Sequence, residues 1–260
     1  MLTGKTAIVT GSTSGIGLAI AHALAAKGCN LVINSYSDRT EDHAVAAGLS
    51  ERHGVQSVYV KADMADPQQA RGLVEQAAAK FGGVDILVNK AGIQFVAPVE
   101  EFPTERWDAI IAINLSAAFH TVAAAVPHMK AAGWGRIVNI ASAHGLRASP
   151  NKSAYVAAKH GIVGLTKAVA VELAGKGVTS NAVCPGFVMT PLVETQIEDR
   201  MTETGFDRET TIRDVILAKQ PSEQFATVEE IGAATAFLCS EDASQISGTT
   251  LSVDGGWTAQ

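Results

Sequence analysis

The sequence predicts a doubly wound α/β fold, with one parallel sheet of about seven strands and helices on both faces. Short β-branched runs alternate with longer helical patterns from one end of the chain to the other. The strand runs are continuously apolar rather than alternating, as expected when helices cover both faces of a parallel sheet. A glycine-rich turn and then a helix follow the first run, which is the order of elements in such folds.

The individual elements follow from residue type and from the signals at their ends. The predicted strands are residues 6–10, 31–34, 57–61, 86–89, 136–140, 179–183 and 251–253. The predicted helices are residues 15–27, 67–81, 104–132, 154–175 and 228–240, and Asp66-Pro67 and Pro103-Thr104 are typical helix starts. Right-handed crossovers between the parallel strands give a Rossmann-type sheet.

The 260 residues are predicted to form a single domain, because no proline- or serine-rich linker, repeat or low-complexity tract divides them. The one polar interruption runs from Pro191 to about Thr227, where charged residues are mixed with Val193, Ile197 and Met201. That mixture is typical of amphipathic helices packed loosely across the mouth of a sheet. We predict a helical lid over residues 191–220, with a plain surface excursion as the alternative.

Composition and charge exclude several function classes. A net charge of -6 without a basic stripe argues against nucleic acid and anionic membrane as partners. The start of the chain lacks the pattern of a signal peptide, and no uninterrupted apolar run of about 18 residues predicts a membrane span. Cys29, Cys184 and Cys239 are odd in number and far apart, so neither a disulfide framework nor a metal site is expected. We expect a cytoplasmic protein.

A glycine-rich turn with GxxxGxG spacing, formed by Gly11, Gly15 and Gly17, follows the first strand. Glycines let such a turn bring backbone N–H groups against a pyrophosphate at a helix N-terminus. A second loop, Asn89-Lys90-Ala91-Gly92, follows the fourth strand. Ligands of doubly wound sheets bind where strand order reverses, so the first and fourth strands should flank a dinucleotide. Asp63, after the third strand, is expected either to bond the adenine edge or to cap the next helix.

The end of the second strand bears on the choice between NAD and NADP. An acidic residue is usual there in NAD-binding sheets, but this chain has Asn34 and Ser35. Ser14 occupies a position where a basic residue often meets the 2′-phosphate of NADP, which leaves Arg39 as the only nearby cation. The sequence therefore predicts NAD as the cofactor.

Tyr155 and Lys159 form the strongest catalytic signal. Their spacing of four residues places the phenol and the ammonium on one face of a helix. An unperturbed tyrosine has a pKa of roughly 10, and a nearby ammonium favours the phenolate. Ser142 follows the fifth strand at the same edge of the sheet. The three side chains are typical of a group that moves a proton by general acid–base catalysis.

These motifs together resemble the short-chain dehydrogenase/reductase family over essentially the whole chain. The matching segments are residues 10–17, 89–92, Asn114, Ser142, 155–159 and 185–186. The resemblance implies that Ser142 positions the substrate oxygen, Tyr155 exchanges the proton, and Lys159 lowers the tyrosine pKa while holding the nicotinamide ribose. It also implies that Asn114, the fourth catalytic residue, binds a water that links Lys159 to solvent.

The resemblance also implies the cofactor contacts and one departure. The expected contacts are Gly11, Thr13, Ser14, Gly15, Ile16, Gly17, Tyr36, Asp63, Met64, Asn89, Ala91, Gly92, Tyr155, Lys159, Pro185, Gly186, Val188 and Thr190. The family usually carries a second asparagine where this chain has Lys90. A buried ammonium there must find a carboxylate or solvent, so we predict a local rearrangement or reduced stability rather than changed chemistry.

Several polar residues are expected to converge on a small carboxylate substrate. Gln94, His144, Lys152 and Gln196 supply one cation and neutral groups, which suits an anion of fixed orientation. Within the family, the segments around these residues are most similar to dehydrogenases of small hydroxy acids. That resemblance implies a hydroxy acid and its keto acid as substrates, with Ser142 and Tyr155 at the reacting oxygen and Trp257 at the apolar end. Phe187 stands where some members carry Trp.

Two alternatives remain open. The first is another family member that acts on a 3-oxoacyl thioester, a sugar or a steroid, although an acidic chain does not favour an acyl-carrier docking surface. The second is an NAD-sensing protein without turnover, which should have a broken proton relay. The resemblance further implies a homotetramer built from the long helices after the fourth and fifth strands and from the C-terminal strand.

Overall fold

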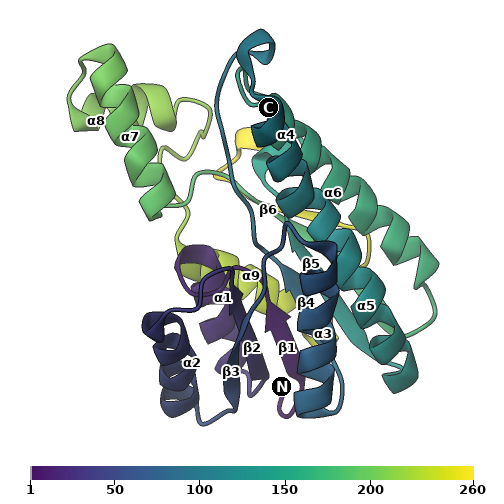
Figure 1. Cartoon of the computed structure of the whole chain (residues 1–260). Helices are drawn as coiled ribbons and strands as arrows, with labels where there is room; N and C mark the ends of the chain where they lie inside the picture. Colours follow the sequence, from purple (N-terminus) through teal and green to yellow (C-terminus); the bar gives the residue numbers. More distant parts are fainter. Residues whose placement is uncertain (1) are drawn as a thin grey trace.

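All seven predicted strands form, and they lie side by side in one parallel sheet (Figure 1). The computed structural model describes residues 2–260, except for the side chain of residue 192. The strands are β1 (Thr6–Val9), β2 (Asn30–Ser35), β3 (Ser57–Lys61), β4 (Ile86–Asn89), β5 (Gly135–Ile140), β6 (Val178–Pro185) and β7 (Thr250–Val253). Their order is β3-β2-β1-β4-β5-β6-β7, so the predicted doubly wound class is confirmed.

Helices cover both faces of this sheet (Figure 1). They are α1 (Gly15–Ala25), α2 (Thr40–His53), α3 (Pro67–Phe81), α4 (Thr104–Ile111), α5 (Ala117–Ala132), α6 (Ser153–Glu172) and α9 (Val228–Leu238). Successive residues of a strand point to opposite faces, so Val9 belongs to the core under α1 and α9. Its neighbour Ile8 belongs to the core under α3 and α5. Two buried faces explain why the strands are apolar throughout.

Two helical segments differ from the prediction. The stretch 104–132 is not one regular helix, because a π-helical turn at Ala112–Ser116 separates α4 from α5. Such turns are frequent at functional sites, and this one carries Asn114. Helix α2 was not among the predicted helices, since few of its residues are apolar and only Asp42, Ala46 and Leu49 are buried.

The stretch 104–132 bears on the expectation that no segment spans a membrane. It is long and apolar enough, by length and composition alone, to cross a membrane. In the structure its residues Ala125 and Met129 are fully buried in the core that includes α3. Packing in this core accounts for part of the apolar character, since 44% of the most apolar 18-residue window is buried.

Strands β1 and β4 are neighbours at the point where the chain reverses its direction of winding. The loops that follow them are bound together, because Thr10 Oγ1 accepts hydrogen bonds from the backbone N–H of Lys90 and of Ala91, both at 3.0 Å. Gly11 has φ +62°, and a Cβ there would lie 3.0 Å from Ala91 Cα. The glycine is therefore needed for the approach of the two loops at the predicted cofactor edge.

The predicted lid is helical and stands apart from the helices that cover the sheet (Figure 1). It consists of α7 (Pro191–Thr204), α8 (Arg208–Thr210) and a π-helical turn at Thr211–Ile216. Thr190 caps α7 by accepting a hydrogen bond from Val193 N–H at 3.4 Å. The segment has an apolar core of its own, which includes Ile197, Ile216 and Leu217. Such a separately packed unit can move as a body, although its movement stays a prediction.

Candidate active site

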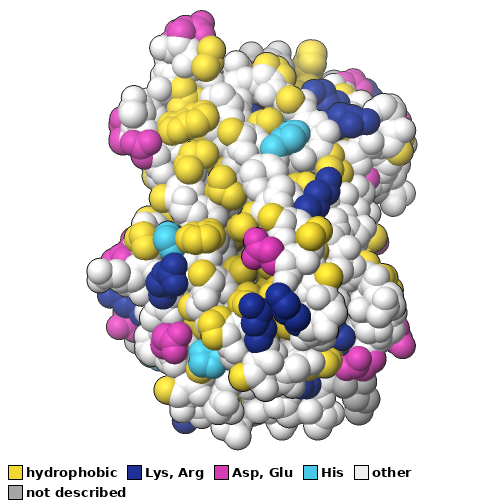
Figure 2. Space-filling model, turned by 90° about the vertical axis from the view of Figure 1, so that its right-hand side faces the viewer, with side chains coloured by type: hydrophobic (Ala, Val, Ile, Leu, Met, Phe, Trp, Pro, Cys, Tyr) yellow, Lys and Arg dark blue, Asp and Glu magenta, His cyan; other side chains and the backbone are white. Residues whose placement is uncertain are grey.

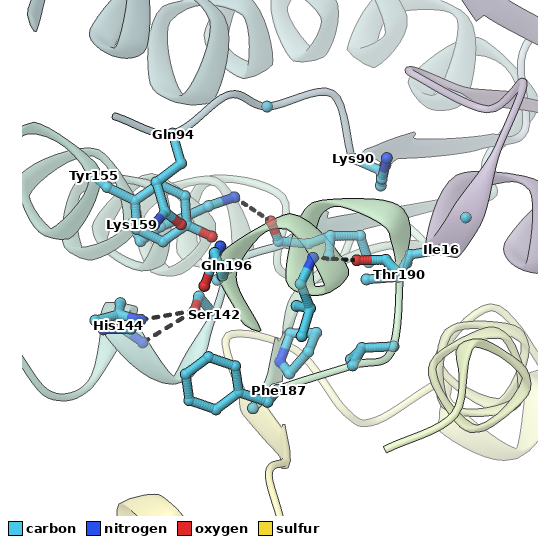
Figure 3. A pocket seen from close by; sticks show the side chains of 18 of the residues that line it. Ile16, Lys90, Gln94, Ser142, His144, Tyr155, Lys159, Phe187, Thr190 and Gln196 are labelled. Atoms are coloured by element: carbon cyan, nitrogen blue, oxygen red, sulfur yellow. Dashed lines mark hydrogen bonds between the residues drawn. The ribbon is translucent and has the colours of Figure 1, made fainter. Parts of the chain in front are cut away.

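One cavity at the carboxyl edge of the sheet, of about 290 Å³, brings most of the predicted residues together (Figure 3). The predicted residues that line it are Ser14, Gly15, Ile16, Gly92, Gln94, Ser142, His144, Lys152, Tyr155, Lys159, Pro185, Gly186, Val188, Thr190, Gln196 and Trp257. The prediction did not assign to the site Lys90, Ile93, Ile140, Ala141, Phe187, Pro191 and Val193, which also line it. Residues distant in sequence are thus gathered where a doubly wound sheet binds ligands.

The N-terminus of α1 gives the cavity an anion-binding end. Ser14, the N-cap residue, makes no side-chain capping bond, and the first turn carries no acidic residue. Its backbone N–H groups therefore remain available to a ligand beside Ser14, Gly15 and Ile16. A Cβ at Gly17 would lie 2.3 Å from Gly11 O, so only glycine lets the helix begin this close to the turn. The residues present fit the pyrophosphate of a dinucleotide.

Several predicted cofactor residues lie outside this cavity: Gly11, Thr13, Gly17, Tyr36, Asp63, Met64, Asn89 and Ala91. The amide of Asn89 is buried and donates to Asn139 Oδ1 at 2.9 Å, so it joins β4 to β5. Asp63 Oδ1 accepts from Ala65 N–H in a local turn, and the cap of α3 is Asp66. The capping alternative for Asp63 was therefore wrong. Tyr36 is 76% exposed at the end of β2.

Asn34 and Asp42 organise the end of β2. Asn34 Oδ1 accepts from Gly11 N–H at 3.3 Å, and its Nδ2 donates to backbone carbonyls of this edge. The buried Asp42 carboxylate accepts from Ser37 Oγ at 2.7 Å and from Arg39 N–H at 3.1 Å. These hydrogen bonds, that of Ser37 foremost, lower the pKa of Asp42. Arg39 also forms an ion pair with Asp42 at 3.5 Å, so the one predicted cation near this end is already engaged.

Tyr155 and Lys159 lie on one face of α6, with Lys159 Nζ 5.6 Å from the centre of the phenol ring. The ammonium donates to Ile140 O at 2.8 Å. Burial raises the pKa of Tyr155, and the hydrogen bond with Ser142 acts in the opposite direction. The net direction for Tyr155 is thus set by burial, and the lowering of its pKa by Lys159 that the resemblance implies stays a prediction. Burial, followed by the charge of Lys90, lowers the pKa of Lys159 to about 8.

Asn114 is buried in the π-helical turn and fastens the loop that follows β4. Its Oδ1 accepts from Ile93 N–H at 2.8 Å, and its Nδ2 donates to Ile93 O at 2.9 Å. It does not line the main cavity, and its role toward a water stays a prediction. What the structure shows is that Asn114 holds Ile93, and with it the neighbouring Gln94, at the cavity wall.

His144 and Lys152 lie at the other end of the cavity. Burial, and then the charges of Lys152 and Lys219, lower the pKa of His144 to about 3, so the imidazole is neutral. His144 Nε2 lies 3.0 Å from Ser149 Oγ, and Ser149 Oγ accepts from Lys219 Nζ at 3.4 Å. Sequence reasoning missed Ser149 and Lys219, because a polar loop residue and a lid lysine carry no pattern of their own. Burial, followed by Arg200 and Lys219, lowers the pKa of Lys152 to about 8.

Apolar rings close this end of the cavity. Trp257 is 5% exposed and stacks on Phe187, with ring centres 5.4 Å apart and planes 5° from parallel. Its ring also meets His144 edge to face at 5.0 Å. Trp257 thus lines the cavity beside His144, and its predicted place at the apolar end of a substrate stays a prediction.

Among the described residues Lys90 forms no ion pair with a carboxylate, but it is only half-buried, so solvent, the other partner that the sequence argument allowed, stays open to it. Its Nζ donates instead to Gly11 O at 3.3 Å, across the gap between the two cofactor loops. The pairing of β4 with β5 is regular from Ile86 to Asn89, so the predicted rearrangement of the sheet does not occur in this structure. An effect of Lys90 on stability stays a prediction.

Basic side chains are dispersed on the face that Figure 2 shows. Lys and Arg lie there among hydrophobic, acidic and neutral groups and do not form one continuous stripe over the described residues of this face. The predicted absence of a nucleic-acid surface stays an expectation, and this face offers no feature that opposes it.

The sequence is similar to proteins of known family along almost its whole length. A family model described as Enoyl-(Acyl carrier protein) reductase matches residues 11–258. The chain is 54% identical over 256 residues to a D-beta-hydroxybutyrate dehydrogenase of Rhizobium meliloti (strain 1021), covering 98% of this chain and 99% of that protein. It is 55% identical over 260 residues to a D-beta-hydroxybutyrate dehydrogenase of Cupriavidus necator, covering 100% of each.

A solved structure supports the same fold. It is described as a putative NAD(P) dependent gluconate 5-dehydrogenase from Beutenbergia cavernae with bound NADP at low occupancy. The identity is 40%, the TM-score is 0.89, and the match covers 100% of this chain and 98% of that one. The family model and the two relatives match nearly the whole of this sequence.

Proposed function

This chain belongs to the short-chain dehydrogenase/reductase family, and on that premise we propose that it catalyses the reversible oxidation of (R)-3-hydroxybutyrate to acetoacetate with NAD. One observation carries the proposal. A single cavity is lined by Ser142, Tyr155 and Lys159 and also by Lys152 with the neutral polar side chains of Gln94, His144 and Gln196. The names of the two relatives at 54% and 55% identity support the substrate.

The proton step uses residues of α6 and of the loop after β5. NAD, when bound, supplies the acceptor for the hydride that leaves C3 of the substrate. Ser142 donates a hydrogen bond to the substrate oxygen, and Tyr155 as phenolate accepts the hydroxyl proton. Because burial raises the pKa of Tyr155, the phenolate needs the nearby Lys159 ammonium as its counter-charge. In the reverse direction Tyr155 returns the proton to the carbonyl oxygen.

The carboxylate of the substrate binds at the other end of the cavity. Lys152 supplies the positive charge there, while Gln94, Gln196 and the neutral His144 supply hydrogen bonds that fix its orientation. Gln196 lies on α7, so closure of the lid brings its amide to the carboxylate and excludes water.

We also propose, on the family resemblance, that the protein is a homotetramer and that it is located in the cytoplasm.

The engagement of Arg39 favours NAD over NADP. A 2′-phosphate requires a free cation near the end of β2, and Arg39 is paired there with Asp42. We expect kcat/KM for NAD to exceed that for NADP by at least about tenfold, because the 2′-phosphate lacks one charged hydrogen bond. Initial rates with each cofactor at a fixed hydroxy acid concentration measure the ratio.

A substrate panel in the same assay separates the alternatives. A 3-oxoacyl thioester, a sugar and a steroid alcohol are compared with 3-hydroxybutyrate. A higher kcat/KM with NADP than with NAD would contradict the proposed cofactor. Faster turnover of the thioester, the sugar or the steroid alcohol than of 3-hydroxybutyrate would contradict the proposed substrate. Tight NAD binding without any turnover would point to the sensing protein instead.

A further inference from the structure

We propose that Lys90 binds the pyrophosphate–ribose part of the dinucleotide, so that this chain holds its cofactor with a positive charge that the usual asparagine of the family does not supply. The proposal rests on the proposed cofactor and extends it to one residue. Lys90 departs from the family pattern, and the catalytic steps described above make no use of it.

Lys90 is placed at the cofactor end of the cavity. It directly follows β4, where its backbone N–H donates to Thr10 Oγ1 at 3.0 Å, and its side chain lines the same cavity as Ser14 and Ile16. Figure 3 shows it on the side of Ile16 and Thr190, away from His144. The ammonium therefore shares a cavity wall with the open N-terminus of α1, where phosphate oxygens bind.

The ammonium has donors to spare. It offers three N–H groups, and among the described residues its hydrogen-bond partner is Gly11 O, at a long 3.3 Å. Gly11 belongs to the turn that must face the cofactor, so the amine already points along that turn. A ligand oxygen near the turn can accept one of the remaining N–H groups without breaking this contact.

The charges around Lys90 call for an anion. Lys90, Lys152 and Lys159 line the cavity, and the described lining residues include no Asp or Glu. Burial lowers the pKa of Lys90, and the charge of Lys90 in turn helps to lower that of Lys159. Partly buried ammonium groups without a carboxylate are unfavourable, and an anionic ligand between them relieves the repulsion. A pyrophosphate is the anion that the dinucleotide brings to this end.

The alternative is a purely structural role, in which Lys90 only stabilises the turn through its hydrogen bond to Gly11 O. The two roles predict different effects on the binding of ligands with and without phosphate. A fastening role affects every ligand that uses the turn, whereas a charge contact affects only those with a pyrophosphate and fades as salt screens it.

The test is calorimetric binding of NAD, ADP-ribose and adenosine to the wild type and to Lys90→Asn, which introduces the usual family residue. At low salt we expect Lys90→Asn to weaken NAD and ADP-ribose binding about tenfold and to leave adenosine unchanged, as befits one charge-assisted hydrogen bond. At about 0.5 M salt the difference should shrink to about threefold or less. Lys90→Arg should retain most of the affinity, and the exposed Lys80→Asn on α3 is the matched control.

Two results overturn the inference. If the wild type and Lys90→Asn bind NAD with equal affinity, Lys90 does not contact the cofactor. If Lys90→Asn loses affinity for adenosine and for ADP-ribose equally, Lys90 only stabilises the turn. The cofactor proposal itself fails in a different way, since the wild type would then bind neither NAD nor ADP-ribose.

Discussion

Tyr155→Phe is expected to lower kcat for 3-hydroxybutyrate oxidation by about 10²- to 10⁴-fold, the usual contribution of a positioned acid–base group. The phenyl ring keeps the packing of the tyrosine against His144, whose ring centre is 5.8 Å away. Only the proton acceptor is lost. Steady-state rates give kcat, and fluorescence titration should show that NAD still binds within about twofold of the wild type.

Tyr59→Phe is the matched control for this change. Its hydroxyl donates to Ser35 O at 3.2 Å at the end of β2 and lies outside the cavity. Its kcat should stay within about threefold of the wild type. A Tyr155→Phe enzyme with nearly full kcat would contradict the assignment of the phenol as the proton acceptor.

Lys152→Ala is expected to raise KM for 3-hydroxybutyrate by about 10- to 100-fold, because a charged hydrogen bond to the carboxylate is removed. The effect on kcat should be much smaller, since we propose that Lys152 binds the carboxylate and takes no part in the proton step. Lys167→Ala, which changes an exposed lysine on α6, the helix that follows Lys152, is the control and should leave KM unchanged. An unchanged KM in Lys152→Ala would contradict the assignment of Lys152 to carboxylate binding.

The same lysine predicts a pH dependence of KM. The pKa of Lys152 is lowered to about 8, so the ammonium is present below that pH and is lost as the pH rises through it. Carboxylate binding therefore weakens, and KM rises, above about pH 8. Arg200, Lys219 and the neutral His144 face Lys152, and a guanidinium in its place stays charged. Lys152→Arg should accordingly give a flatter KM profile, and an unaltered profile would assign the titration to another group such as Lys159.

The fold could be predicted closely because its signals are local. The bounds of β3, β4 and α3 match the predicted residues, since β-branched runs and an Asp-Pro helix start depend on neighbours in sequence. The spacing of Tyr155 and Lys159 placed both on one helix face for the same reason. The adjacency of β1 and β4, which sets the cofactor edge, followed from the reversal of strand order in doubly wound sheets.

Features that depend on burial and on contacts between distant segments could not be predicted. The π-helical turn around Asn114 arises inside an otherwise regular helical pattern. The direction of the Tyr155 pKa shift is set by burial, which no sequence spacing reports. The hydrogen-bond partner of Lys90 proved to be a carbonyl 79 positions earlier in the chain, a contact that the expectation of a carboxylate or solvent did not include.

The measurement that tests the central claim most directly is the initial rate of NADH formation with (R)- and (S)-3-hydroxybutyrate offered separately. The proposed function, which places Tyr155 and Ser142 at the hydroxyl and Lys152 at the carboxylate and takes the R form from the names of the two relatives, predicts turnover of the R enantiomer and a rate for the S enantiomer at least about a hundredfold lower. Equal or faster NADH formation from the S enantiomer, or none from the R enantiomer in an enzyme that binds NAD, would contradict the account.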